Sequence, residues 1–211
     1  MTVQPSLKLS YFDFRARAEP TRLALTIGGI PFEDHRVARS DWPELKKKTP
    51  FGQMPVLTVN GATQVAQSNG LLRYAGTLAG LYPAADPLKA ALVDQIVLHV
   101  EDMYNTFYAT FREQDEERKK AARKVIAEER FPAMLASLDA VIAKHSAGTW
   151  SVGDSMTVAD IVVYTFVNDL KSDNWDHIPT TLADSHHNVL RVFNGVASHP
   201  KVVEWEAAHR K

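Results

Sequence analysis

Residues 7–29 read LKLSYFDFRARAEPTRLALTIGG, and this stretch changes from strand to helix within a few residues. Its first six residues alternate apolar and polar side chains and are β-prone, which predicts a strand over residues 7–12. Pro20 stands near the start of the next segment and two glycines stand at its end, the usual order for an α-helix, which we expect over residues 18–27. The chain therefore begins as a strand followed by a helix.

The next fifty residues extend this pattern into a small α/β domain. SDWPELKKK predicts a short helix in a long connection, and Ser68 begins a helix with the sequence SNGLLRYAGTLAGL. Asn60 and Gly61 tolerate the positive φ angles of a tight hairpin turn. The order β, α, β, α, β, β, α predicts a four-stranded α/β domain. The three further strand segments are residues 32–37, 54–59 and 62–68.

Helical spacing continues from there to the end of the chain and predicts an all-α second domain. GLYPAADP, with its two prolines, ends the first domain, and Thr157 with Asp160 forms a capping-box pattern at the start of a helix. We expect domains at residues 1–82 and 89–211, joined by a linker at 83–88. The helical patterns cover residues 88–112, 118–145, 157–170 and 188–209.

Composition narrows the class of function. The chain has 211 residues with 24 basic and 25 acidic ones, so no summed charge favours nucleic acid or an anionic membrane, and we expect a small molecule or a protein as partner. With no cysteine, the chain has no disulfide, thiolate metal site or sulfur nucleophile, so any thiol chemistry uses an imported thiol. No apolar run has the length of a secretory or membrane-spanning segment, from which we expect a cytoplasmic location.

Three short motifs carry the candidate chemistry. LSYFDFRARAEPTR places Tyr11 at a strand end and two arginines before the next helix, a common position for ligand sites in α/β domains. PFGQMPVL places Met54 before a proline, whose preceding bond can be cis and expose the backbone for strand-like pairing. Gln67 and Ser68 directly precede a helix, where Ser68 can be the N-cap and the free N–H groups can receive a carboxylate.

In this order and spacing, the motifs YFDFRARAEPTR, DWPELK, QMPVL and QS resemble the glutathione transferase family over nearly the whole chain. The resemblance is closest to the sigma class, which includes the haematopoietic prostaglandin D synthases, while the alpha, mu and pi classes share parts of it. It implies a thioredoxin-like N-terminal domain with a four-stranded mixed sheet, followed by an all-α C-terminal domain. It also implies a cytoplasmic homodimer that uses glutathione as co-substrate and requires no metal.

The resemblance assigns the activation of the thiol to two residues. Tyr11 matches the catalytic tyrosine, whose hydroxyl hydrogen-bonds the glutathione sulfur and lowers the thiol pKa. Arg17 matches an arginine that supports the thiolate. Ser10 is the competing hydroxyl, as in theta and delta-like transferases, and ranks second because the residues after Tyr11 follow the tyrosine-class pattern.

The resemblance also implies a set of glutathione-binding residues beyond Tyr11. Asp102 matches an acidic residue that reaches the glutathione amine of the neighbouring subunit, with Glu101 as the alternative. Phe51 stands where some other classes carry an aromatic residue that inserts into the partner. The remaining residues are Trp42 and Lys46 for the glycine end, Gln53 and Met54 for the cysteinyl unit, and Gln67 and Ser68 for the γ-glutamyl end.

The second substrate is expected in an apolar cleft between the domains, lined by Phe12, Phe14, Tyr104 and Phe107. The implied function is the conjugation of glutathione to electrophilic, mostly hydrophobic substrates, a detoxification reaction. One alternative is a glutathione-dependent prostaglandin isomerase or peroxidase. Another is a non-catalytic ligand-binding or structural member of the fold, and the intact set of Tyr11, Arg17, Gln67 and Ser68 argues against it.

Overall fold

The computed structural model describes residues 4–209, which form two compact units. The first unit holds residues up to Tyr82 and takes in the chain again from Glu204. The second unit runs from Pro83 to Val203. The end of the chain, which the sequence analysis assigned to the helical domain, therefore belongs to the first unit.

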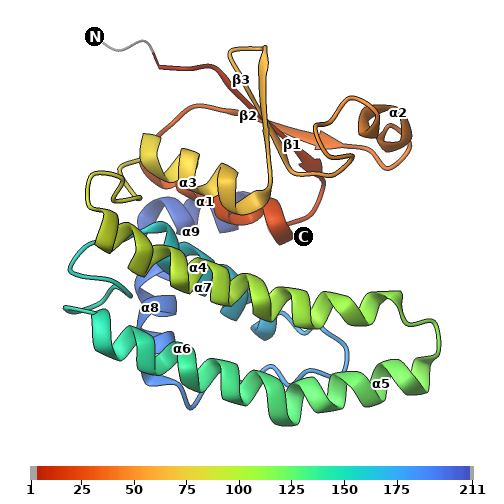
Figure 1. Ribbon diagram of the computed structural model, residues 1–211, viewed down its shortest axis with the longest axis vertical. Coiled ribbons are helices and arrows are strands. Elements are labelled where there is room, and N and C mark those ends of the chain that lie inside the picture. Colours follow the sequence, from red (N-terminus) through yellow and green to blue (C-terminus); the bar gives the residue numbers. More distant parts are fainter. Residues whose placement is uncertain (1–3, 210–211) are drawn as a thin grey trace. The chain divides into compact units, whose positions relative to one another are not determined.

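Within the described residues the first unit is built on a mixed sheet of four strands, as predicted, and these strands lie in the order β2-β1-β3-β4 (Figure 1). β1 is parallel to β2 and antiparallel to β3, and β3 and β4 form an antiparallel hairpin. Asn60 and Gly61 turn this hairpin with φ angles of 52° and 67°, the left-handed conformation that the dipeptide predicts. The strands are β1 (Leu7–Phe12), β2 (Glu33–Val37), β3 (Val56–Val59) and β4 (Thr63–Ala66).

Helices α1 and α3 pack together on the same side of this sheet (Figure 1). They approach so closely that a Cβ on Gly28 would lie 2.4 Å from the Cβ of Ala79, so only glycine fits there. The helical segments of this unit before residue 83 are η1 (Ala16–Ala18), α1 (Glu19–Gly28), α2 (Trp42–Lys46) and α3 (Ser68–Leu78).

The second unit is helical, and its core is formed around α7, which is buried along nearly its whole length. The predicted capping box is confirmed: the Asp160 carboxylate accepts from the backbone N–H of Thr157 at 2.6 Å. No helix within residues 4–209 has the length and hydropathy to cross a membrane. The helices are α4 (Pro87–Tyr108), η2 (Ala109–Arg112), α5 (Glu116–Val125), the π-helix η3 (Ile126–Arg130), α6 (Phe131–His145), α7 (Val158–Lys171) and α8 (His187–Ala197).

Two of the boundaries that differ from the prediction have a clear local cause. The helical pattern over residues 188–209 is broken into α8 and α9 (Pro200–Ala208), because Pro200 has no N–H to donate and disfavours a helical residue before it. The linker predicted at residues 83–88 is also shorter, since α4 begins at Pro87, where the Asp86 side chain accepts from the backbone N–H of Lys89.

Candidate functional site

One end of the sheet gathers the motifs that the sequence analysis singled out. Ser10 of β1 pairs with Val56 of β3, which in turn pairs with Ala66 of β4. One step further toward this end stand the next residue of β1, Tyr11, the residue before β3, Pro55, and the residue after β4, Gln67. The antiparallel register therefore brings three segments that are far apart in the sequence together at this end of the sheet.

Tyr11 is buried at this end of the sheet, with 6% of its surface exposed. Burial raises the pKa of Tyr11, and a hydrogen bond from the backbone of Arg17 and the charges of Arg17 and Arg22 offset this only in part. The hydroxyl therefore keeps its proton at neutral pH, which makes Tyr11 a hydrogen-bond donor rather than a base.

The competing hydroxyl of Ser10 has a different environment. Its oxygen lies 3.0 Å from Nδ1 of His35 on the neighbouring strand β2. Successive side chains of a strand point to opposite faces of the sheet, so Ser10 and Tyr11 face opposite ways. Ser10 is therefore engaged with β2 and directed away from the Tyr11 hydroxyl.

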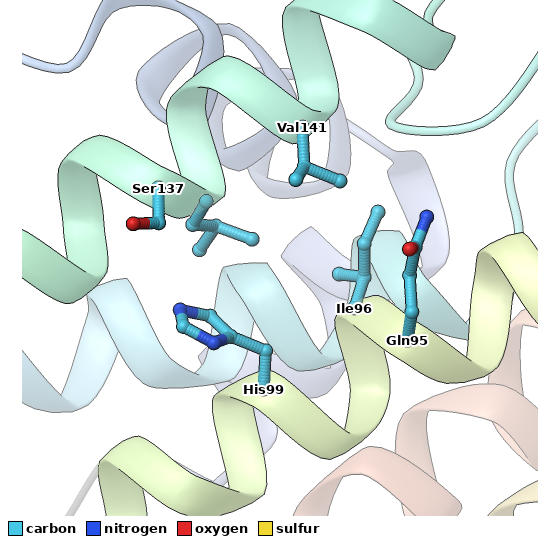
Figure 2. Close-up of a pocket in the computed structure, with 6 residues that line it drawn as sticks. Gln95, Ile96, His99, Ser137 and Val141 are labelled. Atoms are coloured by element: carbon cyan, nitrogen blue, oxygen red, sulfur yellow. The ribbon is translucent and has the colours of Figure 1, made fainter.

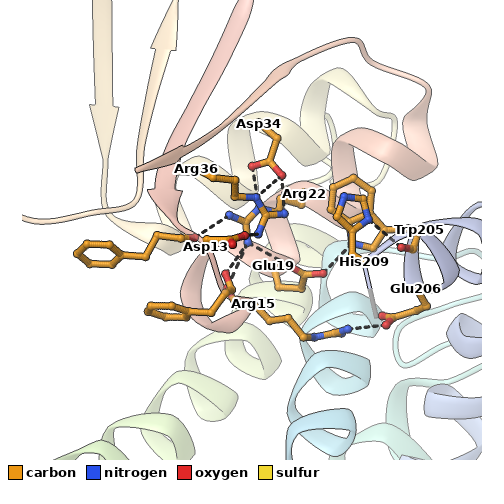
Figure 3. A network of polar contacts seen from close by, with 11 residues as sticks. Asp13, Arg15, Glu19, Arg22, Asp34, Arg36, Trp205, Glu206 and His209 are labelled. Atoms are coloured by element: carbon orange, nitrogen blue, oxygen red, sulfur yellow. Dashed lines mark hydrogen bonds and ion pairs between the residues drawn. The ribbon is translucent and has the colours of Figure 1, made fainter. Parts of the chain in front are cut away.

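Arg22 is a site residue that the sequence analysis did not select. It is fully buried on α1, and its guanidinium lies 5.7 Å from the centre of the Tyr11 ring. Nη1 donates to the carbonyl oxygen of Phe14 at 2.9 Å and Nε to Oδ1 of Asp34 at 3.0 Å (Figure 3). An arginine in the otherwise apolar run after Pro20 was the signal that could have identified it, because buried charges occur almost only where they are paired.

An aromatic cluster surrounds Tyr11 and contains three of the predicted residues. The ring centres of Tyr11 and Phe14 are 5.2 Å apart, and Phe12 stacks on Phe14 at 5.7 Å. Phe12 also contacts the edge of Trp42 at 5.8 Å. The structure thus places Trp42, Phe12 and Phe14 in one continuous cluster with Tyr11, and Phe14 is 43% exposed.

Lys46 and the segment of Gln53 and Met54 meet at Gly52. A Cβ on Gly52, where φ is 62°, would lie 3.4 Å from Cε of Lys46, so the lysine stem passes over this residue. The Met54–Pro55 bond is cis, the isomer that the sequence left open. Gln53 is exposed and Met54 is half-buried.

The start of α3 differs from the prediction in one respect. Ser68 is the first helical residue, and Gln67, not Ser68, is the N-cap. Gln67 has φ of 74° and ψ of 111°, a conformation that costs a non-glycine residue about 1–3 kcal/mol and concentrates at functional sites. No side chain caps the helix, so its first N–H groups and the positive end of its dipole are left for an anion.

The predicted residues of the helical unit have separate environments. Asp102 is exposed on α4 and Glu101 is half-buried. Tyr104 is 8% exposed, and its hydroxyl donates to Asp169 at 2.8 Å. Phe107 is fully buried and stacks on Trp175 with ring centres 4.0 Å apart, which is the packing of a core residue and gives no support to a substrate-lining role.

A separate hollow of about 180 Å³ lies between α4 and α6 of the helical unit (Figure 2). None of the predicted site residues lines it. Within residues 4–209 no three or more histidine, aspartate or glutamate side chains are grouped as a metal site. The residues that line the hollow are Gln95, Ile96, His99, Ser137, Leu138 and Val141.

Comparison with known proteins matches both halves of the chain to one family. The profile of the glutathione S-transferase N-terminal domain matches residues 7–77, and that of the C-terminal domain matches residues 101–209. Glutathione S-transferase 1 of Ascaris suum is 35% identical over 98% of each chain, and hematopoietic prostaglandin D synthase of Gallus gallus is 33% identical over 95% of each. The solved structure of prostaglandin synthase D of Nilaparvata lugens has a TM-score of 0.86 at 29% identity, covering 98% of this chain and 99% of the other.

Proposed function

This chain belongs to the glutathione S-transferase family, and from that premise we propose that it activates the glutathione thiol at Tyr11 for transfer to electrophilic, mostly hydrophobic substrates. The observation that carries the proposal is the environment of the Tyr11 hydroxyl, a buried donor beside the backbone of Arg17 and the charge of Arg22. The family uses glutathione as co-substrate, and membership of the family makes this chain a transferase.

The chemistry consists of pKa tuning and orientation. A free thiol has a pKa near 8.5, so only a few per cent is ionised at neutral pH. A hydrogen bond from Tyr11 and the positive charge of Arg17 favour the thiolate over the thiol. With a chlorodinitrobenzene, the sulfur attacks the carbon that bears chlorine, a C–S bond forms, the C–Cl bond breaks and chloride leaves, while the thiol proton passes to solvent.

We assign the three parts of glutathione to the end of the sheet at which Tyr11 lies. The uncapped start of α3, with Gln67 and Ser68, suits the γ-glutamyl carboxylate, because helix N-termini bind anions. The backbone of Met54 pairs with the cysteinyl unit, next to Gln53. Trp42 and Lys46 receive the glycine end, where the ammonium of Lys46 attracts the terminal carboxylate. Phe12 and Phe14 are the residues beside Tyr11 that we assign to the hydrophobic substrate.

The oligomeric state, the class and the cellular location are predictions that rest on the resemblance to the sigma class. We propose a sigma-like homodimer in which the exposed Asp102 reaches the glutathione of the partner subunit. Phe51, which is 66% exposed, stands where some other classes insert an aromatic residue into the partner. Size-exclusion chromatography with light scattering tests the dimer, and a monomer at micromolar concentration would remove the role of Asp102. A cytoplasmic location and a role in detoxification are expected on the same basis.

The test is a calorimetric titration with glutathione, followed by thiolate absorbance across pH and turnover of a chlorodinitrobenzene in the same samples. S-methylglutathione is the matched control, since it keeps the peptide and has no ionisable thiol. We expect saturable binding of both ligands and a thiolate signal near neutral pH with glutathione alone. Failure to bind glutathione contradicts the proposal, and binding without thiolate or turnover favours a non-catalytic carrier.

A second candidate is the glutathione-dependent isomerisation of a prostaglandin endoperoxide, which the similarity to two prostaglandin D synthases favours. The two reactions differ in stoichiometry, because conjugation consumes one glutathione per turnover, whereas isomerisation returns it. Free thiol measured during turnover of an endoperoxide therefore separates them. A peroxidase reaction would instead convert glutathione to its disulfide.

A further inference from the structure

The last helix of the chain contacts the segment that follows Tyr11. Nε1 of Trp205 donates to Oε1 of Glu19 at 2.7 Å (Figure 3). The next residue of the same helix, Glu206, forms a half-buried ion pair with Arg15. Trp205 and Glu206 thus each contact one residue of the segment at residues 15–19, and all four residues belong to the first unit.

The first contact continues from Glu19 into the backbone beside Tyr11. Glu19 is 2% exposed, and its second oxygen accepts from Nη1 of Arg22 at 3.2 Å. Arg22 in turn donates to the carbonyl oxygen of Phe14 at 2.9 Å and to that of Phe12 at 3.4 Å. A continuous chain of hydrogen bonds therefore joins Trp205 to the residue that follows Tyr11.

The second contact acts at a strained turn. Ala16 has φ of 40°, a left-handed conformation that a residue other than glycine keeps only where its surroundings impose it. Arg15 directly precedes this residue and Arg17, whose backbone hydrogen-bonds the Tyr11 hydroxyl, directly follows it. The anchors on Arg15 and Glu19 thus bracket the turn that presents Arg17 to Tyr11.

We infer that Trp205 and Glu206 are positioning residues of the thiolate site, which hold the turn at residues 15–19 so that Arg17 stays against the Tyr11 hydroxyl. They touch neither glutathione nor the reacting atoms in this assignment. The inference rests on the proposed function, because it concerns the residues that stabilise the thiolate.

This role has a signature that a purely structural role lacks. Loss of an anchor lets Arg17 move from Tyr11, so the thiol pKa of bound glutathione rises and turnover falls at neutral pH. Turnover returns toward the wild-type rate at higher pH, where the thiol ionises without help. The KM for glutathione changes little, because Gln53, Gln67 and Ser68 lie outside the turn. We expect a decrease in kcat of about three- to tenfold at neutral pH, the size of one or two lost hydrogen bonds.

The experiment compares Trp205→Phe and Glu206→Gln with Glu204→Gln in the full-length chain. Glu204 is an exposed carboxylate on the same helix. Glu204→Gln therefore makes the same change of charge as Glu206→Gln at a residue that does not contact the turn. Glutathione is the ligand, and the measurements are thiolate absorbance against pH, kcat, KM and the thermal unfolding midpoint. Glu206→Gln keeps the inference testable should Trp205→Phe fail to fold, because its ion pair is half-buried rather than part of the core.

The expected result is a raised thiol pKa in Trp205→Phe and Glu206→Gln, with a wild-type profile in Glu204→Gln. If both variants keep the wild-type thiol pKa while their unfolding midpoints fall, the two residues only stabilise the fold and the inference is wrong. If wild-type protein itself forms no thiolate, the proposed function fails, which is a separate outcome.

Discussion

Tyr11 of the first unit and Tyr104 of the second are both buried, and they differ in what the hydroxyl does. Tyr11 is 6% exposed and Tyr104 is 8% exposed, and burial raises the pKa of both. The Tyr104 hydroxyl donates its hydrogen to Asp169 at 2.8 Å, and the carboxylate charge raises the pKa of Tyr104 further. The Tyr11 oxygen instead accepts from the backbone of Arg17 and faces cations, so its hydrogen can be donated to an incoming anion.

Residue type and burial therefore do not by themselves identify a catalytic tyrosine. A buried hydroxyl that already donates to a carboxylate is a structural element, because another anion would have to displace that partner. A buried hydroxyl held as an acceptor by backbone and cations is prepared for a thiolate. The distinction predicts different consequences for changes in the two units.

The largest effect is expected for Arg22→Met, which removes the cation beside Tyr11. Glu19, with 3% side-chain exposure, would lose its buried partner, and breaking such a pair costs about 3–5 kcal/mol. Chemical denaturation measures the loss. Arg123→Met is the matched control, since Arg123 is 1% exposed but pairs with Asp176, which is 72% exposed and can return to water. Equal losses in the two variants would contradict this account of the site.

Tyr11→Phe tests the catalytic half of the comparison directly. Loss of one hydrogen bond to a charged sulfur, about 1.5–3 kcal/mol, predicts a decrease in turnover of roughly 10- to 100-fold at neutral pH. The effect on turnover should shrink as pH rises, and the free energy of unfolding should fall by about 1 kcal/mol, because the backbone N–H of Arg17 loses its acceptor. Steady-state kinetics across pH provide the measurement. Unchanged turnover at every pH would return attention to Ser10, despite its contact with His35.

Tyr104→Phe tests the structural half and has a smaller effect. It removes the hydrogen bond to Asp169, and we expect about 1 kcal/mol less stability with kcat and KM unchanged. Thermal unfolding and steady-state kinetics measured on the same preparation decide the outcome. A fall in turnover without a loss of stability would instead support the substrate-lining role that the resemblance assigns to Tyr104.

The fold was largely predictable because its signals are local. The strand over residues 7–12 and the hairpin at Asn60 depend on contiguous residues, and both are confirmed. The break at Pro200 had a readable cause in proline, which the helical periodicity on both sides obscured. The return of the chain end to the first unit has no such local signal, because it depends on packing between distant segments.

The site divides in the same way. Tyr11 was predicted as a site residue from motif and resemblance, and the register of the sheet explains why its motif meets those of Met54 and Gln67. The apolar run around Arg22 indicated a buried, paired arginine, but the partners of Arg22 and Trp205 could not be read from the sequence, since these contacts join separate parts of the fold. The hydrogen bond from Trp205 to Glu19 spans 186 positions, a separation at which a pattern in one chain contains no pairing information.

The smallest effect is expected from the titration of Asp139 in the helical unit. Protonation of this carboxylate in acid should lower the stability of the fold without changing the chemistry at Tyr11. Asp139 of α6 accepts from the backbone N–H groups of Asn188 at 2.8 Å and Val189 at 3.0 Å, and so caps α8. Burial alone would raise the pKa of Asp139, but the hydrogen bonds from Asn188 and Val189 lower it below its usual 3.8.

Because the folded pKa of Asp139 is the lower one, the cap contributes fully above pH 3.8 and is lost as pH falls through that value and below it. Asp139→Ala should therefore cost about 1 kcal/mol at neutral pH, the value of a helix cap, and progressively less in acid. Denaturation of both proteins from pH 7 down to about pH 3 tests this linkage. A difference in stability that stays constant over that range would show that the carboxylate charge is not what caps α8. A change in the thiol pKa of bound glutathione would contradict the expectation that a change in the helical unit alters stability without altering the chemistry at Tyr11.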